Sequence, residues 1–177
     1  MSENTNITWT KAKSHLRSFT FHLSQKLSGQ INRKGLWSSE GSGEIGPRKL
    51  LFRSTGKANK TWTIYDGSTE KSIGEFNFKW KDFQRSKLEL SNGKVFYFKS
   101  TDIFRGVWSW IKEDSLLEQF TFMVDTPLHR SGIIENNAKD LSAEERDILL
   151  LFGLHLQHWI NTWMMTIVIA VIAAISG

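Results

Sequence analysis

The sequence contains no cysteine among its 177 residues, and this absence removes several kinds of chemistry. Disulfide bonds, thiolate catalysis and zinc or iron–sulfur sites built on cysteine are all excluded. Proline occurs only at Pro47 and Pro127, so the chain has no proline-rich linker. A chain of this length supplies one domain with a genuine core. Its eight Trp and twelve Phe favour a β-rich fold or contact with a bilayer.

Charged side chains are absent from Ile148 to the last residue. Two blocks in this region, Ile148–Phe152 and Trp163–Ile175, are apolar, with only Thr166 polar in the second. A helix on a protein surface shows a polar stripe, which these blocks lack. Removing apolar surface from water is worth roughly 25 cal/mol per Å², so both blocks need lipid or a protein core around them.

We interpret residues 162–177 as an apolar tail that anchors the chain in a membrane. Trp159 and Trp163 are one helical turn apart, which is typical of aromatic residues at a membrane interface. Packing of both rings in a protein core is the alternative. The small residues in the tail permit close helix packing and hence a homo-oligomer: Ala170, Ala173, Ala174 and Gly177.

Basic residues are concentrated in the first third of the chain. Residues 1–60 hold 11 Lys and Arg against 3 Asp and Glu, whereas residues 61–177 hold 12 against 15. Positive charge combined with an apolar segment is typical of the cytoplasmic face of an anionic membrane, and a solvated basic surface is the alternative. Residues 1–17 form a polar basic segment without the apolar stretch of a signal peptide. We therefore expect a β-domain on the cytoplasmic side of a membrane.

Alternation with a period of two dominates the chain before Asn137 and predicts short strands. Asp66-Gly67 predicts a hairpin that joins Thr61–Tyr65 to Ser72–Trp80. Short strands separated by turn signals indicate an antiparallel meander in a barrel or a sandwich.

The clearest turn signal is Asn92-Gly93, because these residue types suit the two positive-φ positions of a type I′ turn. A two-residue turn sets Leu90 opposite Val95 and Leu88 opposite Tyr97. In that register Phe96 and Phe98 lie on the other face of the hairpin.

A helix is predicted to start near residue 142, where Ser142-Ala-Glu-Glu145 forms a capping-box sequence. A helix from there to Ile175 would be about 50 Å long at 1.5 Å per residue, longer than a hydrocarbon core of ~30 Å. One straight spanning helix therefore does not account for the whole segment. A polar cluster divides it into two apolar parts: His155, Gln157, His158, Asn161 and Thr162.

The order of elements and several stretches resemble the tubby-like superfamily, which includes the tubby carboxy-terminal domain, the LURP-one-related proteins and the phospholipid scramblases. The stretches are Trp62-Thr-Ile-Tyr-Asp, Ile73-Gly-Glu-Phe, Lys87-Leu-Glu-Leu, Lys94-Val-Phe-Tyr-Phe and Asp147-Ile-Leu-Leu-Leu-Phe.

The resemblance covers Phe19–Asn161 and implies a mainly β fold, an antiparallel closed barrel of short hairpin-linked strands within residues 18–161. A hydrophobic C-terminal helix, Glu145–Trp159, would thread the barrel. It also implies contact with lipid or phosphoinositide through basic residues outside the barrel, or binding without chemistry. The helix of that family ends the domain, whereas this chain continues over Asn161–Gly177.

No motif supports catalysis or a cofactor. Gly41-x-Gly43-x-x-Gly46 has the letters of a dinucleotide loop, but Pro47 and a strand-like stretch follow it, so we interpret Ser38–Pro47 as a flexible loop. Ser54-Thr-Gly-Lys57 lacks the first glycine and the hydroxyl residue of a phosphate-binding loop.

His155 and His158 share a helical face, yet no carboxylate lies in the same turn. A polar position at the end of an apolar block, or at the level of lipid headgroups, is therefore favoured over a metal site. The acidic clusters Glu113-Asp114 and Glu144-Glu145-Asp147 lack partners for acid–base work, and we expect no enzyme activity, no cofactor and no metal.

A basic cluster surrounds one strand and the turn that follows it: Arg48, Lys49, Arg53, Lys57 and Lys60. We predict that part of this cluster binds anionic lipid headgroups, since each basic residue near a charged surface contributes about 1 kcal/mol. A solvated face is the alternative, and no signature of nucleic-acid binding accompanies the charge. The prediction is a non-catalytic, membrane-associated binding module that contacts anionic lipid or a membrane protein. The alternatives are a scramblase-like lipid transporter and a membrane effector whose tail oligomerises and perturbs the bilayer.

Overall fold

The computed structural model describes residues 6–11, 18–22, 28–35, 37–56, 60–102, 105–124 and 131–176. Within these ranges, twelve antiparallel strands form one closed barrel in which strands consecutive in the chain are paired. The strands are β1 Ile7–Lys11, β2 Ser18–His22, β3 Ser28–Arg33, β4 Gly41–Ile45, β5 Arg48–Thr55, β6 Lys60–Asp66, β7 Ser72–Phe78, β8 Lys87–Leu90, β9 Val95–Asp102, β10 Val107–Lys112, β11 Glu118–Val124 and β12 Ser131–Asn136. The predicted mainly β fold with a closed antiparallel barrel is confirmed.

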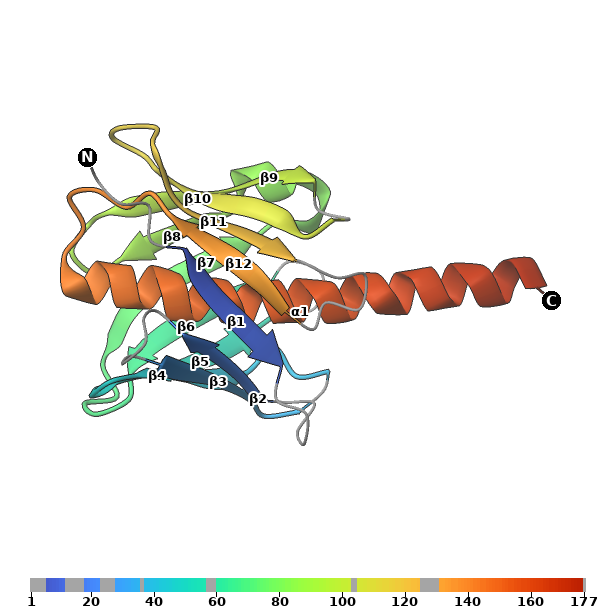
Figure 1. The fold of residues 1–177 in the computed structure, drawn as a ribbon, viewed down its shortest axis with the longest axis horizontal. Coiled ribbons are helices and arrows are strands. Elements are labelled where there is room, and N and C mark those ends of the chain that lie inside the picture. Colours follow the sequence, from blue (N-terminus) through green and yellow to red (C-terminus); the bar gives the residue numbers. More distant parts are fainter. Residues whose placement is uncertain are drawn as a thin grey trace.

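One long helix, α1 (Ala143–Ser176), runs through the barrel and continues beyond it (Figure 1). The capping box starts this helix: the Ser142 Oγ atom accepts a hydrogen bond of 3.2 Å from the Glu145 backbone N–H. In return, the Ser142 backbone N–H donates to the Glu145 Oε2 atom at 3.0 Å. The predicted start of the helix near residue 142 is confirmed. A short 3₁₀ helix, η1 (Trp80–Arg85), lies between β7 and β8.

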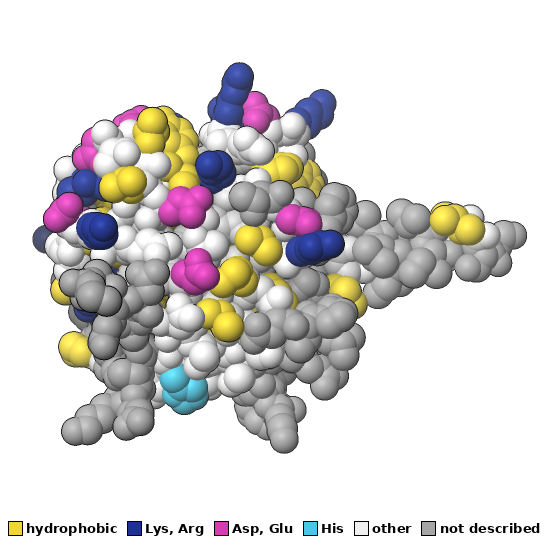
Figure 2. All heavy atoms as spheres, turned by 45° about the horizontal axis from the view of Figure 1, so that its top comes forward, with side chains coloured by type: hydrophobic (Ala, Val, Ile, Leu, Met, Phe, Trp, Pro, Cys, Tyr) yellow, Lys and Arg dark blue, Asp and Glu magenta, His cyan; other side chains and the backbone are white. Residues whose placement is uncertain are grey.

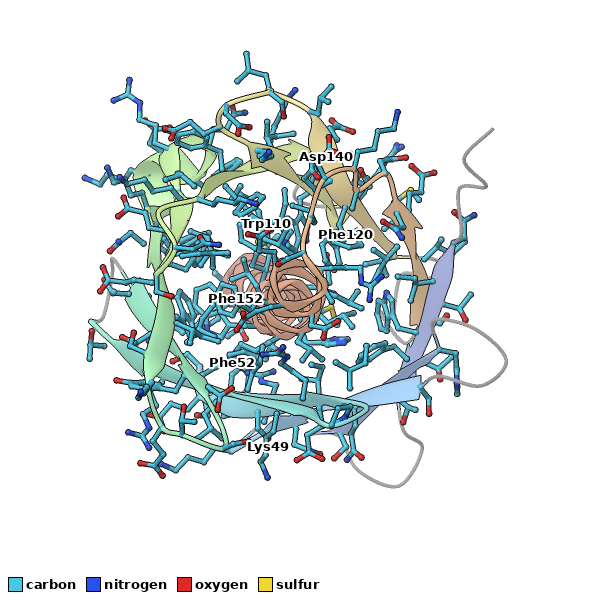
Figure 3. The ribbon with its side chains drawn as sticks, turned by 90° about the vertical axis from the view of Figure 1, so that its left-hand side faces the viewer. Lys49, Phe52, Trp110, Phe120, Asp140 and Phe152 are labelled. Carbon is cyan, nitrogen blue, oxygen red and sulfur yellow. The ribbon has the colours of Figure 1, made fainter. Side chains whose placement is uncertain are left out.

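The interior of the barrel is occupied by α1. Figure 3 looks along the helix and shows Phe52, Trp110 and Phe120 pointing inward from the wall and Lys49 pointing outward. The Phe152 ring of α1 lies 5.5 Å from the Phe52 ring. Every residue of the helix from Ile148 to Asn161 is buried. The first apolar block of the sequence is therefore packed in protein.

Two glycines let α1 and the wall approach each other closely. A Cβ atom on Gly43 would lie 3.1 Å from the Leu151 Cβ atom, and one on Gly153 would lie 2.2 Å from the Phe122 Cζ atom. Gly43 belongs to β4, so the expectation of a flexible loop over Ser38–Pro47 is wrong. Glycine in this strand allows the backbone to pack closely against α1. The spacing of the glycines in the sequence does not predict this packing.

The barrel begins within residues 1–17, which the sequence predicted to be a separate polar basic segment outside the barrel. Ile7–Lys11 forms β1, which pairs with β12 and β2 and so closes the barrel. Ile7 and Trp9 are buried, whereas Thr8 and Thr10 are exposed. This alternation is only four residues long and is surrounded by polar residues, so it predicts a strand only weakly.

The two hairpins predicted from turn signals have different outcomes. The one at Asp66-Gly67 is confirmed, because β6 and β7 pair and the Asp66 backbone N–H donates to the Lys71 carbonyl oxygen at 2.9 Å. The register predicted at Asn92-Gly93 is wrong. The Leu90 backbone N–H donates to the Lys94 carbonyl oxygen at 2.9 Å, so the loop has three residues and Gly93 has φ +85°.

This extra loop residue shifts the register by one position and places Leu88 opposite Phe96. All four large apolar residues of the hairpin then face the core: Leu88, Leu90, Phe96 and Phe98. A three-residue loop with glycine in the left-handed region is the next most common hairpin connection, and burial of two Phe rings favours it here.

The barrel has two distinct ends. We call the end where α1 begins the entry end; it carries the hairpin loops around residues 66–72, 91–94 and 112–118. We call the end where α1 leaves the barrel the exit end; it carries the described residues of the loops around 34–40, 55–60, 79–86 and 102–106. Among the described residues, no helix combines the length and the hydropathy needed to cross a membrane.

Candidate functional site

The exit end carries the most unusual surface of the molecule, because α1 leaves the barrel there with apolar side chains exposed. Asn161 is buried, but Trp163 and Met165 are 36% and 40% exposed, and Ile175 is 80% exposed. Figure 2 shows hydrophobic side chains on the protruding part of the helix. From Thr162 to Ser176 this part is about 22 Å long at 1.5 Å per residue.

A buried arginine fixes the point at which α1 leaves. Arg33, at the end of β3, is only 5% exposed, and its Nη1 atom donates to the Thr162 Oγ1 atom at 2.9 Å. Its Nη2 and Nε atoms donate to the Ser38 carbonyl oxygen at 2.7 and 3.3 Å. Burial lowers the pKa of Arg33 to about 10, so the group keeps its positive charge at neutral pH. No carboxylate among the described residues forms an ion pair with Arg33, so its charge adds to the positive potential of the exit end.

The polar cluster of α1 lies inside the barrel near this end. The His155 Nε2 atom is 2.9 Å from the Ser39 carbonyl oxygen, and burial lowers the pKa of His155 from 6.5 to about 3. The imidazole is therefore neutral at physiological pH and donates from Nε2. The His158 ring packs edge-on against Trp9, with ring centres 4.6 Å apart. No group of three potential metal-ligating side chains occurs in the described part of the chain.

The loop between β3 and β4 places a tryptophan on the rim of the exit end. Trp37 is 60% exposed, although Ser39, two residues later, is held by the barrel. The Ser39 carbonyl oxygen accepts a hydrogen bond of 2.7 Å from the Trp62 indole N–H in addition to that from His155. The chain thus presents a large aromatic ring to solvent close to a point that is fixed to the barrel. Sequence reasoning missed both Trp37 and Arg33; the one available signal was a lone tryptophan within a Gly/Ser-rich stretch.

The two ends differ in charge. Among the described residues, basic side chains outnumber acidic ones at the exit end: Lys34, Lys60, Lys79, Lys81, Arg85 and Arg105 against Glu40, Asp82 and Asp102. Around the entry end, from the loops already named and residues 46–48 and 136–147, the balance is reversed: Asp66, Glu70, Glu113, Asp114, Glu118, Asp140, Glu144, Glu145 and Asp147 against Arg48, Lys71, Lys94, Lys112, Lys139 and Arg146. The apolar helix therefore leaves the barrel through its basic end.

The structure does not bring the predicted headgroup-binding residues to one surface. Arg48 lies at the entry end, where its guanidinium contacts Glu144 at 3.1 Å and Asp147 at 3.6 Å. These ion pairs tie β5 to the first turns of α1. Lys49 lies on the outer wall and pairs with Glu44 at 3.1 Å.

Arg53 and Lys60, the other described members of that cluster, lie nearer the exit end. The Arg53 guanidinium lies 4.8 Å from the centre of the Tyr65 ring on the outer wall. Arg53 also lines a surface pocket of about 340 Å³ together with Arg33 and Lys34. The Lys60 Nζ atom donates to the Gly56 carbonyl oxygen at 3.3 Å. Lys57 lies outside the described residues.

The two tryptophans predicted at a membrane interface differ in burial, because they lie on either side of the point where α1 leaves the barrel. Trp159 is buried within the barrel, and its ring centre lies 4.9 Å from that of Trp62 and 5.5 Å from that of Phe78. Its role is core packing, the alternative that the sequence left open. Trp163 stands one turn further along, on the exposed side of the mouth.

Comparisons with protein-family models, with curated proteins and with solved structures found no match to this chain.

Proposed function

We propose that the protein is a non-catalytic, membrane-associated binding module whose exit end contacts anionic lipid. The observation that carries this proposal is that the exposed apolar part of α1 leaves the barrel through a rim of basic side chains. Apolar side chains gain free energy in the acyl region, while Lys and Arg near an anionic surface contribute about 1 kcal/mol each. A single surface that combines both features favours lipid over a water-soluble ligand.

The packing of the barrel supports a binding role rather than lipid movement through the interior. From Ile148 to Asn161, the side chains of α1 are enclosed by the wall. A barrel around a helix is also the arrangement that the tubby-like resemblance implies, and we include that relationship in the proposal. The anionic lipid of the cytoplasmic leaflet is the surface that the charge of the exit end fits.

Flotation with vesicles tests the apolar part of the proposal. The full chain should float with phosphatidylcholine vesicles that contain phosphatidylserine and less with phosphatidylcholine alone. The double variant Met165→Asp with Ile175→Asp should stay at the bottom of the gradient. The matched control is Leu116→Asp with Leu117→Asp, which changes two exposed apolar residues at the entry end and should float like the unaltered chain. Equal flotation of both double variants would contradict the proposal.

Charge reversal tests the basic rim. Lys79 and Lys81 are exposed at the exit end and form no ion pair with a described acidic residue. Replacing both with Glu should weaken binding to phosphatidylserine vesicles roughly 30-fold or more, since each lysine contributes about 1 kcal/mol. Replacing the exposed Lys71 and Lys139 at the entry end makes the same change in net charge and should have little effect. Added salt should reduce the difference between the two double variants.

A further inference from the structure

We propose that Trp37 is a second membrane anchor, separate in sequence from α1, and that the barrel therefore sits on the bilayer with a fixed tilt. The inference rests on the proposed function, which assigns only α1 and the basic rim to the membrane. It adds an interaction surface formed by the β3–β4 loop, and its partner is the interfacial region of a lipid bilayer.

The first argument is the position of the ring. Arg33 donates hydrogen bonds both to the Ser38 carbonyl oxygen and to the Thr162 hydroxyl. Ser38 directly follows Trp37, and Thr162 directly precedes Trp163. One buried guanidinium thus holds together the two backbone segments that carry exposed tryptophans at the exit end. Two segments that lie far apart in the sequence therefore present the same residue type on one rim.

The second argument is that described residues on both sides of Trp37 are held by hydrogen bonds while its ring is exposed. The Ser39 carbonyl oxygen accepts hydrogen bonds from Trp62 of β6 and His155 of α1, and the Ser39 and Ser54 hydroxyl oxygens lie 2.6 Å apart. The Lys34 backbone N–H donates to the Glu40 carbonyl oxygen at 3.1 Å. Residues held in this way lose little conformational entropy when the ring enters a membrane.

The third argument is the chemistry of the residue. A tryptophan side chain has a large apolar body and one N–H donor, and it is therefore enriched at the level of lipid headgroups. Lys34, in the same loop, is exposed and pairs with Glu40 at 2.9 Å; the proposal places its ammonium group beside the anionic headgroups as well. The other strongly exposed apolar residues at a hairpin tip, Leu116 and Leu117, lie at the entry end among Glu113, Asp114 and Glu118, a surface that an anionic bilayer repels.

The absence of cysteine allows the proposal to be tested by labelling at a single site. Two full-length variants, Trp37→Cys and Leu116→Cys, each carry an environment-sensitive fluorophore on the new thiol. They are mixed with phosphatidylcholine–phosphatidylserine vesicles with and without a lipid-borne quencher. We expect a blue shift and quenching at position 37 and neither at position 116.

Unlabelled variants measure the contribution of the ring itself. Trp37→Ala should bind the same vesicles roughly tenfold or more weakly, because most of the ring is exposed in the free protein and its apolar area would be buried in lipid. Leu116→Ala, an apolar truncation at an even more exposed position of the entry end, should bind unchanged. Since Trp37 is not part of the barrel core formed by the described residues, far-UV circular dichroism of Trp37→Ala should show the same β-barrel fold as the unaltered chain.

Each other outcome overturns the proposal. If the chain floats with vesicles but the label at position 37 is neither shifted nor quenched, Trp37 is not an anchor while the proposed function stands. If labels at positions 37 and 116 are quenched alike, the barrel has no fixed orientation and the inference fails. If the unaltered chain does not float at all, the proposed function fails and the inference falls with it.

Discussion

The Nη1 atom of Arg33 donates a hydrogen bond of 2.9 Å to the Oγ1 atom of Thr162 and so joins the end of β3 to the point where α1 leaves the barrel. The Thr162 hydroxyl in turn donates to the His158 carbonyl oxygen at 2.8 Å, within the helix. The wall of the barrel and the helix inside it are therefore connected by a polar contact at the exit end in addition to their apolar packing. This contact fixes where the protruding part of the helix starts.

Replacing Arg33 with Lys should lower the free energy of unfolding by about 1–3 kcal/mol. Lysine keeps the buried charge but lacks the planar fork that reaches Ser38 and Thr162 together. Urea unfolding followed by tryptophan fluorescence measures the change. Lys34→Arg, at the exposed neighbouring position, should change stability by less than about 0.5 kcal/mol. An equal effect of the two substitutions would show that the fork does not matter.

Stability should fall as pH falls below 6.5, because His155 is neutral in the folded protein. Burial lowers its pKa from 6.5 to about 3, so between these values the unfolded chain binds a proton that the folded chain does not. Linkage then gives a loss of about 2 kcal/mol between pH 7 and pH 5. Glu145, whose pKa is lowered in the folded state, stays ionised in this range.

His155→Gln should flatten this dependence, since glutamine does not titrate and retains an N–H donor for the Ser39 carbonyl oxygen. Denaturant midpoints at the two pH values measure the slope. His22→Gln, at an exposed position of β2, is the matched control and should keep the slope of the unaltered chain. A slope that persists in His155→Gln would assign the pH dependence to another group.

Adjacent glutamates at the start of α1 should differ in their effect on stability. Glu145 is buried and contacts Lys94 at 2.8 Å, Asn92 at 2.7 Å and the Ser142 backbone N–H at 3.0 Å. Glu144 is exposed and contacts only Arg48 among the described residues. We expect Glu145→Ala to cost about 2–4 kcal/mol and Glu144→Ala less than about 1 kcal/mol. Thermal unfolding of the two variants tests the order, and a larger effect at Glu144 would refute it.

Gly153→Ala should destabilise the protein even though alanine favours a helix by about 1 kcal/mol relative to glycine. The new Cβ atom would lie 2.2 Å from the Phe122 Cζ atom, inside a barrel that cannot expand. Overpacking of this kind lowers the free energy of unfolding by about 1–3 kcal/mol, which we expect to exceed the gain from the higher helix propensity of alanine. Gly35→Ala, where the nearest atom is 3.6 Å away, serves as control and should be neutral. A more stable Gly153→Ala variant would show that Phe122 moves aside readily.

Elements that depend on residues close together in the sequence could be predicted, whereas elements that depend on distant contacts could not. Ser142 and Glu145 form a pattern within four residues, and Asp66-Gly67 lies between two alternating runs, so the helix start and that hairpin could be found from sequence. The register at Asn92-Gly93 depended on burial of Phe96 and Phe98 against residues far along the chain. Local turn preference alone therefore selected the wrong loop length.

The candidate site was harder to predict from the sequence, because it also depends on contacts between residues that are far apart in the chain. Charge counts in the first third indicated a basic surface, but they did not show that Arg48 would be held by acidic residues at the start of α1. The buried hydrogen bond between Arg33 and Thr162 joins residues 129 positions apart, and no local sequence pattern predicts it. Trp159 and Trp163 look alike in sequence, and only the position of the barrel mouth places one ring in the core and the other outside.

The position of α1 inside the barrel has a consequence for biosynthesis. The ribosome makes all twelve strands before it makes the helix that fills them. Until residues 148–161 have left the exit tunnel, the inward-facing rings of the strands have no partner in the interior, and β1 also waits for β12 to close the wall. Contacts between residues this distant in sequence form slowly. We therefore expect these apolar side chains to be prone to aggregation on the nascent chain, because the barrel is completed only after the helix has been synthesised.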